Sequence, residues 1–272
     1  MAIADAGLDA LAPNLVRALD DDDPHAKQMA LMALGELRVE SAVDRVAIEL
    51  QAEEAPVRFQ AVMAFPRVCR ERARAVKALL DATHDEDPLI IHIALRMAEE
   101  LGDEGDAVAD RELLKRARQL LDHESDMVRL AAAVMLGRSG SRDGADLLVA
   151  AANRGLQTHE SEDEAAAIEL CGELELSEAT FALEKRAFAG LLSRDPFAWH
   201  ARVALASMGH DRAVRWILSE LDAWTRERRS LAVAAVARAR ITAARSRVEA
   251  MRGRPERADP DAVEEALAVL GK

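Results

Sequence analysis

The sequence predicts an all-α fold in which about seven or eight antiparallel helix pairs stack into a solenoid. Three observations support this fold class: a composition suited to helices, apolar residues at helical spacing, and a pattern that recurs every 31 to 38 residues. Half of the 272 residues are apolar, aromatic residues make up only 3%, and tyrosine is absent. Alanine and leucine dominate the apolar residues, and this mixture favours helices over strands.

An alanine marks the middle of the first helix in each repeat. Around Ala30, for example, apolar residues follow at Ala33, Leu34 and Leu37, which lie on one face of a helix. Because alanine is small, it lets neighbouring helices approach closely at this position. The marker alanines are Ala30, Ala61, Ala94, Ala132, Ala167, Ala201 and Ala232.

A second amphipathic helix is predicted after each marker helix. A single helix pair cannot bury its apolar face alone, so neighbouring pairs must stack. We therefore predict one solenoid domain over residues 1–272, with a half-repeat cap in residues 1–20 and a C-terminal cap in residues 258–272. The second helices are predicted in residues 42–50, 72–80, 113–121, 144–152, 180–192, 213–221 and 244–251.

Acidic residues and proline precede several marker helices, as in "LDDDDPHAKQ" from Leu19. A calcium-binding loop counted from Asp20 would need a glutamate at its twelfth position, where the chain has Leu31. Aspartate instead suits a helix N-cap, and proline suits the first helical position. Pro24, Pro56, Pro88 and Pro196 recur at this place. The basic residues three places before the marker alanine are expected to pair with an acid of the preceding turn: Lys27, Arg58 and Arg129.

The repeated pattern is DxDPxxxxxAxxALGxL, with Val-Arg before the alanine in "PVRFQA" and "MVRLAA". It resembles HEAT repeats, especially the short HEAT-like repeats of phycobiliprotein lyases. The resemblance covers about residues 20–270; it is good in 126–152 and poor in the last two repeats. It implies an α-α superhelix. Members of that superfamily are mostly protein-binding scaffolds, and a few are enzymes, so the resemblance makes a bilin lyase-like enzyme the leading alternative to a scaffold.

Two further enzymatic alternatives follow from the resemblance. HEAT-like deoxyhypusine hydroxylases hold two irons with repeated His-Glu pairs, and this chain has His123-Glu124 and His159-Glu160. Both pairs fall in predicted turns, however, and two further pairs of the family's ligand set are absent. HEAT-like DNA glycosylases use tryptophans and an aspartate on a basic concave surface. The corresponding candidates are Trp199, Trp216 and Trp224 with Asp195 or Asp222, but residues 1–200 carry 39 acidic against 22 basic side chains and would repel DNA.

The first candidate partner surface is a face of the marker helices that carries methionine and aromatic residues where solvated helices usually carry charge. By resemblance, the marker helices line the concave side of the solenoid. This face is either buried by tight curvature or open as an adaptable groove for a partner's helix or extended segment. Its residues are Met29, Met32, Phe59, Met63, His92, Val134, Trp199 and His200.

The second candidate surface is arginine-rich. Residues 201–257 contain 13 arginines against 6 acidic residues, whereas the whole chain has a net charge of −13. This section is either a solvated helix pair or a docking face, for an acidic protein first and nucleic acid second. The opposite charge of the remaining chain also permits head-to-tail self-association. The arginines recur as Arg238 and Arg240, Arg245 and Arg247, and Arg252 and Arg254.

The leading prediction is therefore a non-enzymatic protein-interaction scaffold with no cofactor and no catalytic or metal-binding residues. A phosphate-binding glycine loop, a nucleophile elbow and a zinc-spaced cysteine set are not found in the sequence. Cys69 and Cys171 are expected to be buried free thiols. Without a membrane-spanning stretch or an export signal, we expect a cytoplasmic protein that does not insert into membranes and is unlikely to bind nucleic acid.

Overall fold

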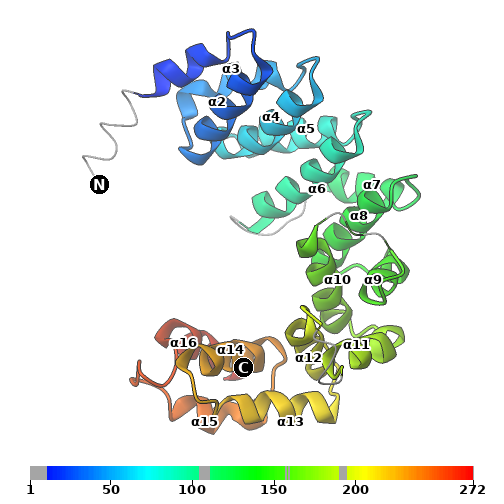
Figure 1. Cartoon of the computed structure of the whole chain (residues 1–272), viewed down its shortest axis with the longest axis vertical. Helices are drawn as coiled ribbons and strands as arrows, with labels where there is room; N and C mark the ends of the chain where they lie inside the picture. The colour runs from blue at the N-terminus through cyan, green and yellow to red at the C-terminus, as the bar shows by residue number, and fades with distance from the viewer. Residues whose placement is uncertain (1–10, 104–110, 157, 159, 190–194, 272) are drawn as a thin grey trace. The chain divides into compact units, whose positions relative to one another are not determined.

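The computed structural model describes residues 11–103, 111–156, 158, 160–189 and 195–271 (Figure 1). Within these ranges every regular element is a helix, which confirms the all-α fold class. The chain divides into two compact units, residues 1–143 and 144–272. Each unit is described separately below. That the two units form one continuous solenoid stays a prediction.

Unit 1 consists of two layers of helices. The marker helices form one layer, in which each packs on the next, and the second helices form the other layer, packed on the marker helices. The marker helices are α2 (Pro24–Glu36), α4 (Ala55–Val68), α6 (Pro88–Asp103) and α8 (Asp126–Arg138). The second helices are α3 (Val43–Glu49), which follows the short 3₁₀ turn η1 (Glu40–Ala42), α5 (Arg72–Ala82) and α7 (Arg111–Leu120). Residues 11–18, in the predicted N-terminal cap, are also helical.

Unit 2 repeats this alternation. Its marker helices are α10 (Ser161–Glu173), α12 (Ala198–Ser207) and α14 (Arg226–Arg238). Helix α16 (Pro260–Leu270), in the predicted C-terminal cap, packs on α14. Its second helices are α9 (Ala145–Ala152), α11 (Thr180–Ala187), α13 (Asp211–Glu220) and α15 (Arg245–Glu249), of which α11 and α15 follow the 3₁₀ turns η2 (Ser177–Ala179) and η3 (Thr242–Ala244).

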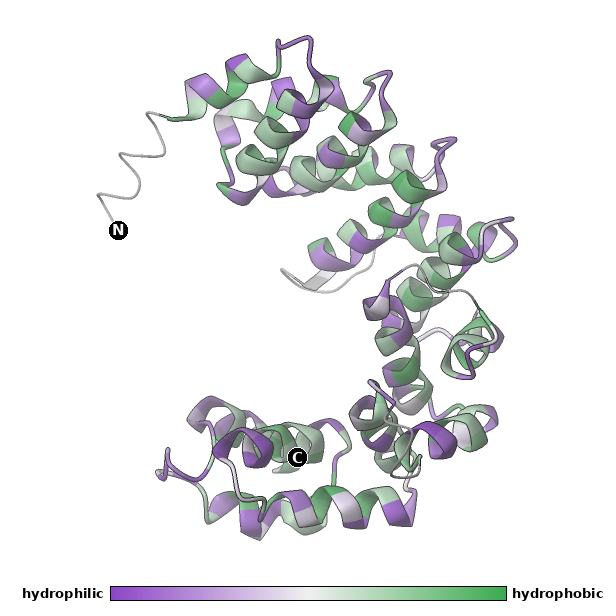
Figure 2. Ribbon diagram, in the orientation of Figure 1, coloured by the Kyte–Doolittle hydropathy of each residue, from purple (hydrophilic) through white to green (hydrophobic). Residues whose placement is uncertain are grey.

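The marker alanines lie where the helices of each unit meet. All seven have at most 3% of their surface exposed, as their predicted role requires. Marker helices approach closely at two glycines near their ends, Gly35 against Ala64 and Gly172 against Ala204. Hydrophilic residues gather in the turns (Figure 2).

Aspartate and proline begin the helices largely as predicted. The side chain of Asp23 accepts a hydrogen bond from the backbone N–H of His25, and Asp87 does the same for Leu89. Pro24 and Pro88 are the first residues of α2 and α6, and Pro56 is the second residue of α4. Pro196 departs from the prediction, because α12 begins only at Ala198.

Two of the three basic residues at the start of the marker helices pair differently from the prediction. Lys27 contacts Glu49, and Arg58 forms a two-point ion pair with Asp85, so both acids follow the marker helix instead of preceding it. Toward the preceding turn, Arg58 donates to the backbone carbonyls of Ala52 and Glu53. Two other arginines donate to the equivalent carbonyls: Arg129 to those of His123 and Glu124, and Arg229 to those of Ala223 and Trp224. For Arg58 the prediction was wrong because the guanidinium group satisfies turn carbonyls, which leaves Glu53 and Glu54 exposed. Arg129, by contrast, also forms an ion pair with Asp126, an acid one turn earlier, as predicted.

Several helices end in the same left-handed turn. After α10, the N–H of Glu175 donates to the carbonyl of Gly172, and the N–H of Leu176 donates to that of Cys171. This pair of hydrogen bonds is the Schellman motif, whose left-handed position is usually glycine. Gly140 and Gly209 occupy that position after α8 and α12, but other repeats use a residue with a side chain: Arg38, Arg154, Glu175 and Arg240.

Candidate partner-binding surfaces

The methionines of α2 are exposed. Met29 has 47% and Met32 has 43% of its surface open to solvent. On the neighbouring helix α4, Phe59 and Met63 are half-buried and pack against the apolar core of unit 1. We call these four residues the methionine face.

Contacts between α2 and α4 define how the two halves of this face align. Arg67 donates to Glu36 over 2.8 Å, and Gly35 packs against Ala64. Since residues four apart share a helix face, Met32 and Met63 lie one turn before this ion pair, side by side on the two helices.

An ion-pair network borders the methionine face. The guanidinium group of Arg67 contacts Glu36 on α2 and both carboxylate oxygens of Glu100 on α6, the latter at 3.0 and 3.1 Å. The hydrogen bond with Glu100 is the main reason that the pKa of Arg67 is raised above its ordinary value. Arg67 therefore holds three successive marker helices together beside the exposed methionines.

Two other residues predicted for this face belong to the core. His92 is 2% exposed and Val134 is fully buried, so neither offers surface to a partner. His92 lies on α6, which packs between the marker helices α4 and α8, and Val134 lies on α8, which packs against α6 and α7. For these two positions the buried interpretation holds.

Trp199 and His200 point toward different neighbours. Trp199 is half-buried and makes an edge-to-face contact with Trp216 of α13, with 5.2 Å between the ring centroids. His200 is also half-buried, and its Nε2 lies 3.9 Å from Glu169 of α10. Trp199 thus faces the second-helix layer, and only His200 faces a neighbouring marker helix.

Half of the arginines predicted to dock an acidic partner have carboxylate partners within unit 2. Arg238 contacts Glu169 at 2.6 Å, Arg247 contacts Asp222 at 2.6 Å, and Arg252 contacts Glu264 and Glu249. The hydrogen bond with Glu264 raises the pKa of Arg252 above its ordinary value. Arg245 donates to the carbonyl of Leu270 near the end of α16, and Arg240 and Arg254 are exposed. The role of this section in docking stays a prediction.

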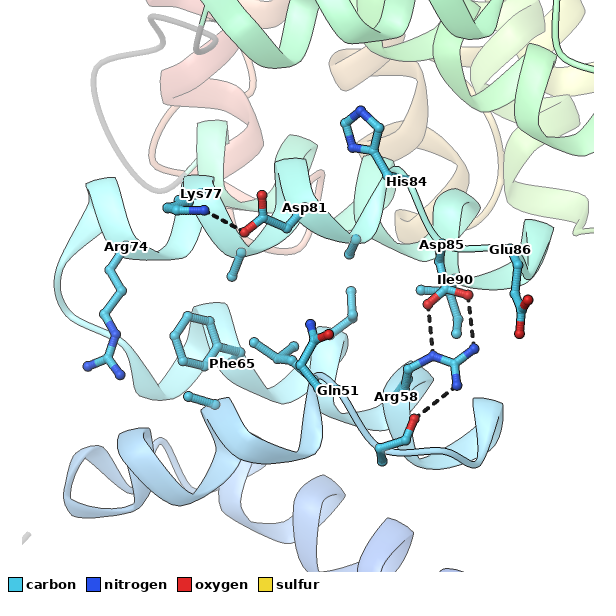
Figure 3. A pocket seen from close by; sticks show the side chains of 16 residues that line it. Gln51, Arg58, Phe65, Arg74, Lys77, Asp81, His84, Asp85, Glu86 and Ile90 are labelled. Atoms are coloured by element: carbon cyan, nitrogen blue, oxygen red, sulfur yellow. Dashed lines mark hydrogen bonds and ion pairs between the residues drawn. The ribbon is translucent and has the colours of Figure 1, made fainter.

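A groove of about 630 Å³ lies between α3 and α5, over α4 (Figure 3). Its apolar floor includes Val62, Phe65 and Ile90, while Arg58 and Asp85 pair at one end and Lys77 pairs with Asp81 along α5. The sequence did not indicate this groove, because it depends on the separation of two helices and not on a residue pattern. Its arginine, lysine and aspartate side chains already have partners, so it offers mainly an apolar slot.

The residues considered for catalysis or metal binding have structural roles. Asp195 pairs with Arg186 and Arg154, and Asp222 pairs with Arg247. His123 accepts a hydrogen bond from the backbone N–H of Ser125, and His159 lies outside the described residues. Among the described residues, no three His, Cys, Asp or Glu side chains converge as metal ligands.

The remaining sequence candidates are two thiols and a tryptophan. Cys69 and Cys171 are free and buried, as predicted. Burial raises the pKa of Cys171 to about 12. Trp224, in the turn before α14, is 97% exposed. In the part of the chain that the structure describes, no helix has the length and apolar character needed to cross a membrane.

Comparison with known proteins identifies the repeat. Residues 77–169 match the family model for HEAT repeats. This segment contains HEAT repeats. No curated protein sequence matches it.

The chain also resembles solved structures. YibA of Escherichia coli superposes with a TM-score of 0.54 at 13% identity, over 96% of this chain and 92% of that one, and this likeness supports the fold and not an activity. The complex of CpcE and CpcF of phycocyanin lyase from Nostoc sp. gives a TM-score of 0.49 at 18% identity, over 95% and 94%. Human deoxyhypusine hydroxylase gives a TM-score of 0.40 at 18% identity, over 100% and 99%.

Proposed function

We propose that this chain is a non-enzymatic adaptor that binds a helical segment of a partner protein on the methionine face. The observation that carries the proposal is the exposure of Met29 and Met32 beside the half-buried Phe59 and Met63. HEAT repeats commonly mediate protein interactions, which agrees with this role.

The chemistry of the face indicates the kind of partner. Methionine is flexible and polarizable, so a surface made of it adapts to different apolar side chains. An amphipathic helix would bring apolar residues at three- and four-residue spacing onto this face. Arg67 and Glu36 at the border would then pair with, or repel, the charged residues that flank the partner's apolar stripe.

A pair of matched variants tests the proposal. Met29→Glu combined with Met32→Glu places charge on the methionine face without filling the core, because both side chains are exposed. Ile48→Glu is the control, since Ile48 is 57% exposed on α3 in the other layer of the same unit. Partners captured from an extract of the source cells would be identified and their affinities measured with purified proteins.

The expected result is a partner that binds the wild type and Ile48→Glu equally and binds the double variant at least tenfold more weakly, which corresponds to about 1.4 kcal/mol. Circular dichroism should show that all three proteins are folded. Equal affinity of all three for every captured partner would contradict the proposal.

The enzymatic alternatives make different predictions. A bilin lyase-like enzyme would transfer a bilin to a carrier protein in a reconstituted assay, and an iron hydroxylase would retain iron after purification. An adaptor does neither, so a bilin-transfer assay and metal analysis of the purified protein distinguish the three.

A further inference from the structure

We propose that a cluster of two arginines and three aromatic residues in unit 2 binds a carboxylate of an acidic segment in a partner protein. The cluster consists of Phe188, Trp199, Arg202, Arg212 and Trp216, and we call it the arginine–aromatic cluster. It is a separate surface from the methionine face, so this inference goes beyond the adaptor proposal and does not depend on it.

The two guanidinium groups contact the same ring. The Cζ atom of Arg202, on α12, lies 4.0 Å from the centroid of the Trp216 ring and 5.8 Å from that of Phe188. The Cζ atom of Arg212, on α13, lies 3.9 Å from the Phe188 centroid. Phe188 thus holds two like charges close together at the end of α11.

No carboxylate neutralises these two charges among the described residues. The Nε–H of Arg202 donates to the backbone carbonyl of Ala187 over 2.8 Å, and neither Arg202 nor Arg212 forms an ion pair there. The nearby acids are already engaged: Glu220 pairs with Arg228 at 2.7 Å, and Glu184 contacts His210 at 2.8 Å. Arg58, Arg67 and Arg186, by contrast, all have carboxylate partners.

Because Arg202 is partly buried, its charge costs more free energy without a carboxylate partner than it would in water. Arg202 is half-buried, and desolvation is the main reason that its pKa is lowered. Attraction by Glu220 opposes this effect, while repulsion from Arg212 and Arg228 adds to it. An anion bound between Arg202 and Arg212 would relieve that repulsion and form charge-assisted hydrogen bonds with the free N–H groups of Arg202.

The rings beside the arginines favour a peptide ligand over a simple anion. Phe188, Trp199 and Trp216 are each half-buried, so part of each side chain is open to solvent next to the charges. Tryptophan and arginine are the residues that most often carry binding energy in protein interfaces. An apolar side chain adjacent to the bound carboxylate would pack on these rings.

The small number of charges in the cluster argues against nucleic acid as the ligand. A polyanion needs several basic side chains along its length, and the cluster contains two arginines. Two arginines bordered by the carboxylates of Glu184 and Glu220 suit one or two carboxylates instead.

Tryptophan fluorescence provides a direct test. The full chain would carry Trp224→Phe, which removes the exposed tryptophan and leaves Trp199 and Trp216 of the cluster as reporters. The probe is a synthetic peptide that alternates glutamate with leucine, and its counterpart with glutamine in place of glutamate measures binding that does not need the charge. Arg212→Gln is the main variant because Arg212 is exposed and its loss should not unfold the chain, and Arg257→Gln is the control because it removes one exposed charge elsewhere in unit 2.

We expect the glutamate peptide to change the fluorescence in a saturable way and to bind Arg212→Gln about tenfold more weakly, with no change for Arg257→Gln. The glutamine peptide should not bind. The inference would be overturned if the glutamate peptide did not bind, or if it bound Arg212→Gln and the parent with equal affinity. Tighter binding of a single-stranded oligonucleotide than of the peptide would also overturn it. The variant with Met29→Glu and Met32→Glu should bind the peptide normally, so failure of the adaptor proposal would leave this result intact.

Discussion

A β-carbon added to Gly172 would lie 2.5 Å from the α-carbon of Ala204. The backbones of α10 and α12 therefore touch at this point, with no room for any side chain on the first helix. Gly35 and Ala64 form the equivalent contact between α2 and α4, where the corresponding distance is 2.9 Å. In both units, helix spacing depends on a glycine near the end of a marker helix.

Gly172→Ala should destabilise the protein even though alanine favours helices. The methyl group would overlap backbone atoms that cannot move without shifting the whole helix, and overpacking of this kind costs about 1–3 kcal/mol. Urea unfolding followed by circular dichroism would measure the loss.

Gly102→Ala is the matched control, because Gly102 lies in α6 and nothing lies within 4 Å of an added β-carbon. There the change should be neutral or stabilise by up to about 1 kcal/mol, as helix propensity alone predicts. Equal effects of the two substitutions would show that the close approach at Gly172 does not limit packing.

Substitution by glycine should stabilise the protein at left-handed backbone positions that carry a residue with a side chain. Glu175 has φ +51° and Arg240 has φ +48°, conformations that cost a residue with a β-carbon about 1–2 kcal/mol. Glu175→Gly and Arg240→Gly should each raise the free energy of unfolding by about 1 kcal/mol, after the greater flexibility of glycine in the unfolded chain is counted. The reverse change, Gly209→Ala at φ +76°, should lower it by a similar amount. A loss of stability in both glycine variants would mean that their side chains contribute more than the strain costs.

The Arg58–Asp85 ion pair should make stability depend on pH in the acid range. Burial tends to raise the pKa of Asp85, but hydrogen bonds from Arg58 and from the backbone of Asp87 outweigh it, so the pKa is lowered. A carboxyl group whose pKa is lower in the folded than in the unfolded chain stabilises the fold above about pH 4 and loses that contribution as the pH falls through its folded pKa.

Asp85→Asn should therefore cost roughly 1–3 kcal/mol at pH 7 and progressively less below about pH 4. Urea unfolding of the variant and the wild type across this range would show the two stabilities converging. Lys77→Ala is a suitable comparison because its ion pair with Asp81 is exposed and should matter little at any pH. A difference that stays constant with pH would exclude Asp85 as the titrating group.

Cys171 should resist thiol reagents in the folded protein. Its side chain is fully buried, and burial raises its pKa to about 12, so almost none of it is thiolate at pH 8. In a Cys69→Ala background, a disulfide reagent should react with Cys171 only at the rate of unfolding and promptly in urea. Rapid reaction of the native protein would show that the region around α10 opens readily.

The repeat was predictable because one residue type has one packing role throughout. Each marker alanine occupies the point where neighbouring marker helices meet, so its spacing gave the number and order of the helices. The segment predicted as the C-terminal cap, residues 258–272, contains α16 (Pro260–Leu270), which begins with Asp259 and Pro260, the same N-terminal signal as in the repeats.

The site residues were harder to predict because exposure depends on neighbours that the sequence does not identify. Met29 and Ile93 both come directly before a marker alanine, yet Met29 is exposed and Ile93 is half-buried, because α6 has marker helices on both sides. Similarly, Arg58 pairs with Asp85, which lies 27 residues further along the chain at the start of the next repeat. The pairing of Trp199 with Trp216 depends on how α12 meets α13. These contacts follow from three-dimensional packing and not from local periodicity.

The contact between Glu169 and Arg238 has a consequence for folding. Helix pairs in a solenoid normally touch only their immediate neighbours, so terminal pairs can unfold independently. Glu169 on α10 and Arg238 on α14 join helices that are two marker positions apart, with α12 between them. This link couples the opening of the C-terminal helices to the middle of unit 2, so amide hydrogens of α14 should exchange together with those of α10, and Arg238→Ala should let α14 exchange earlier.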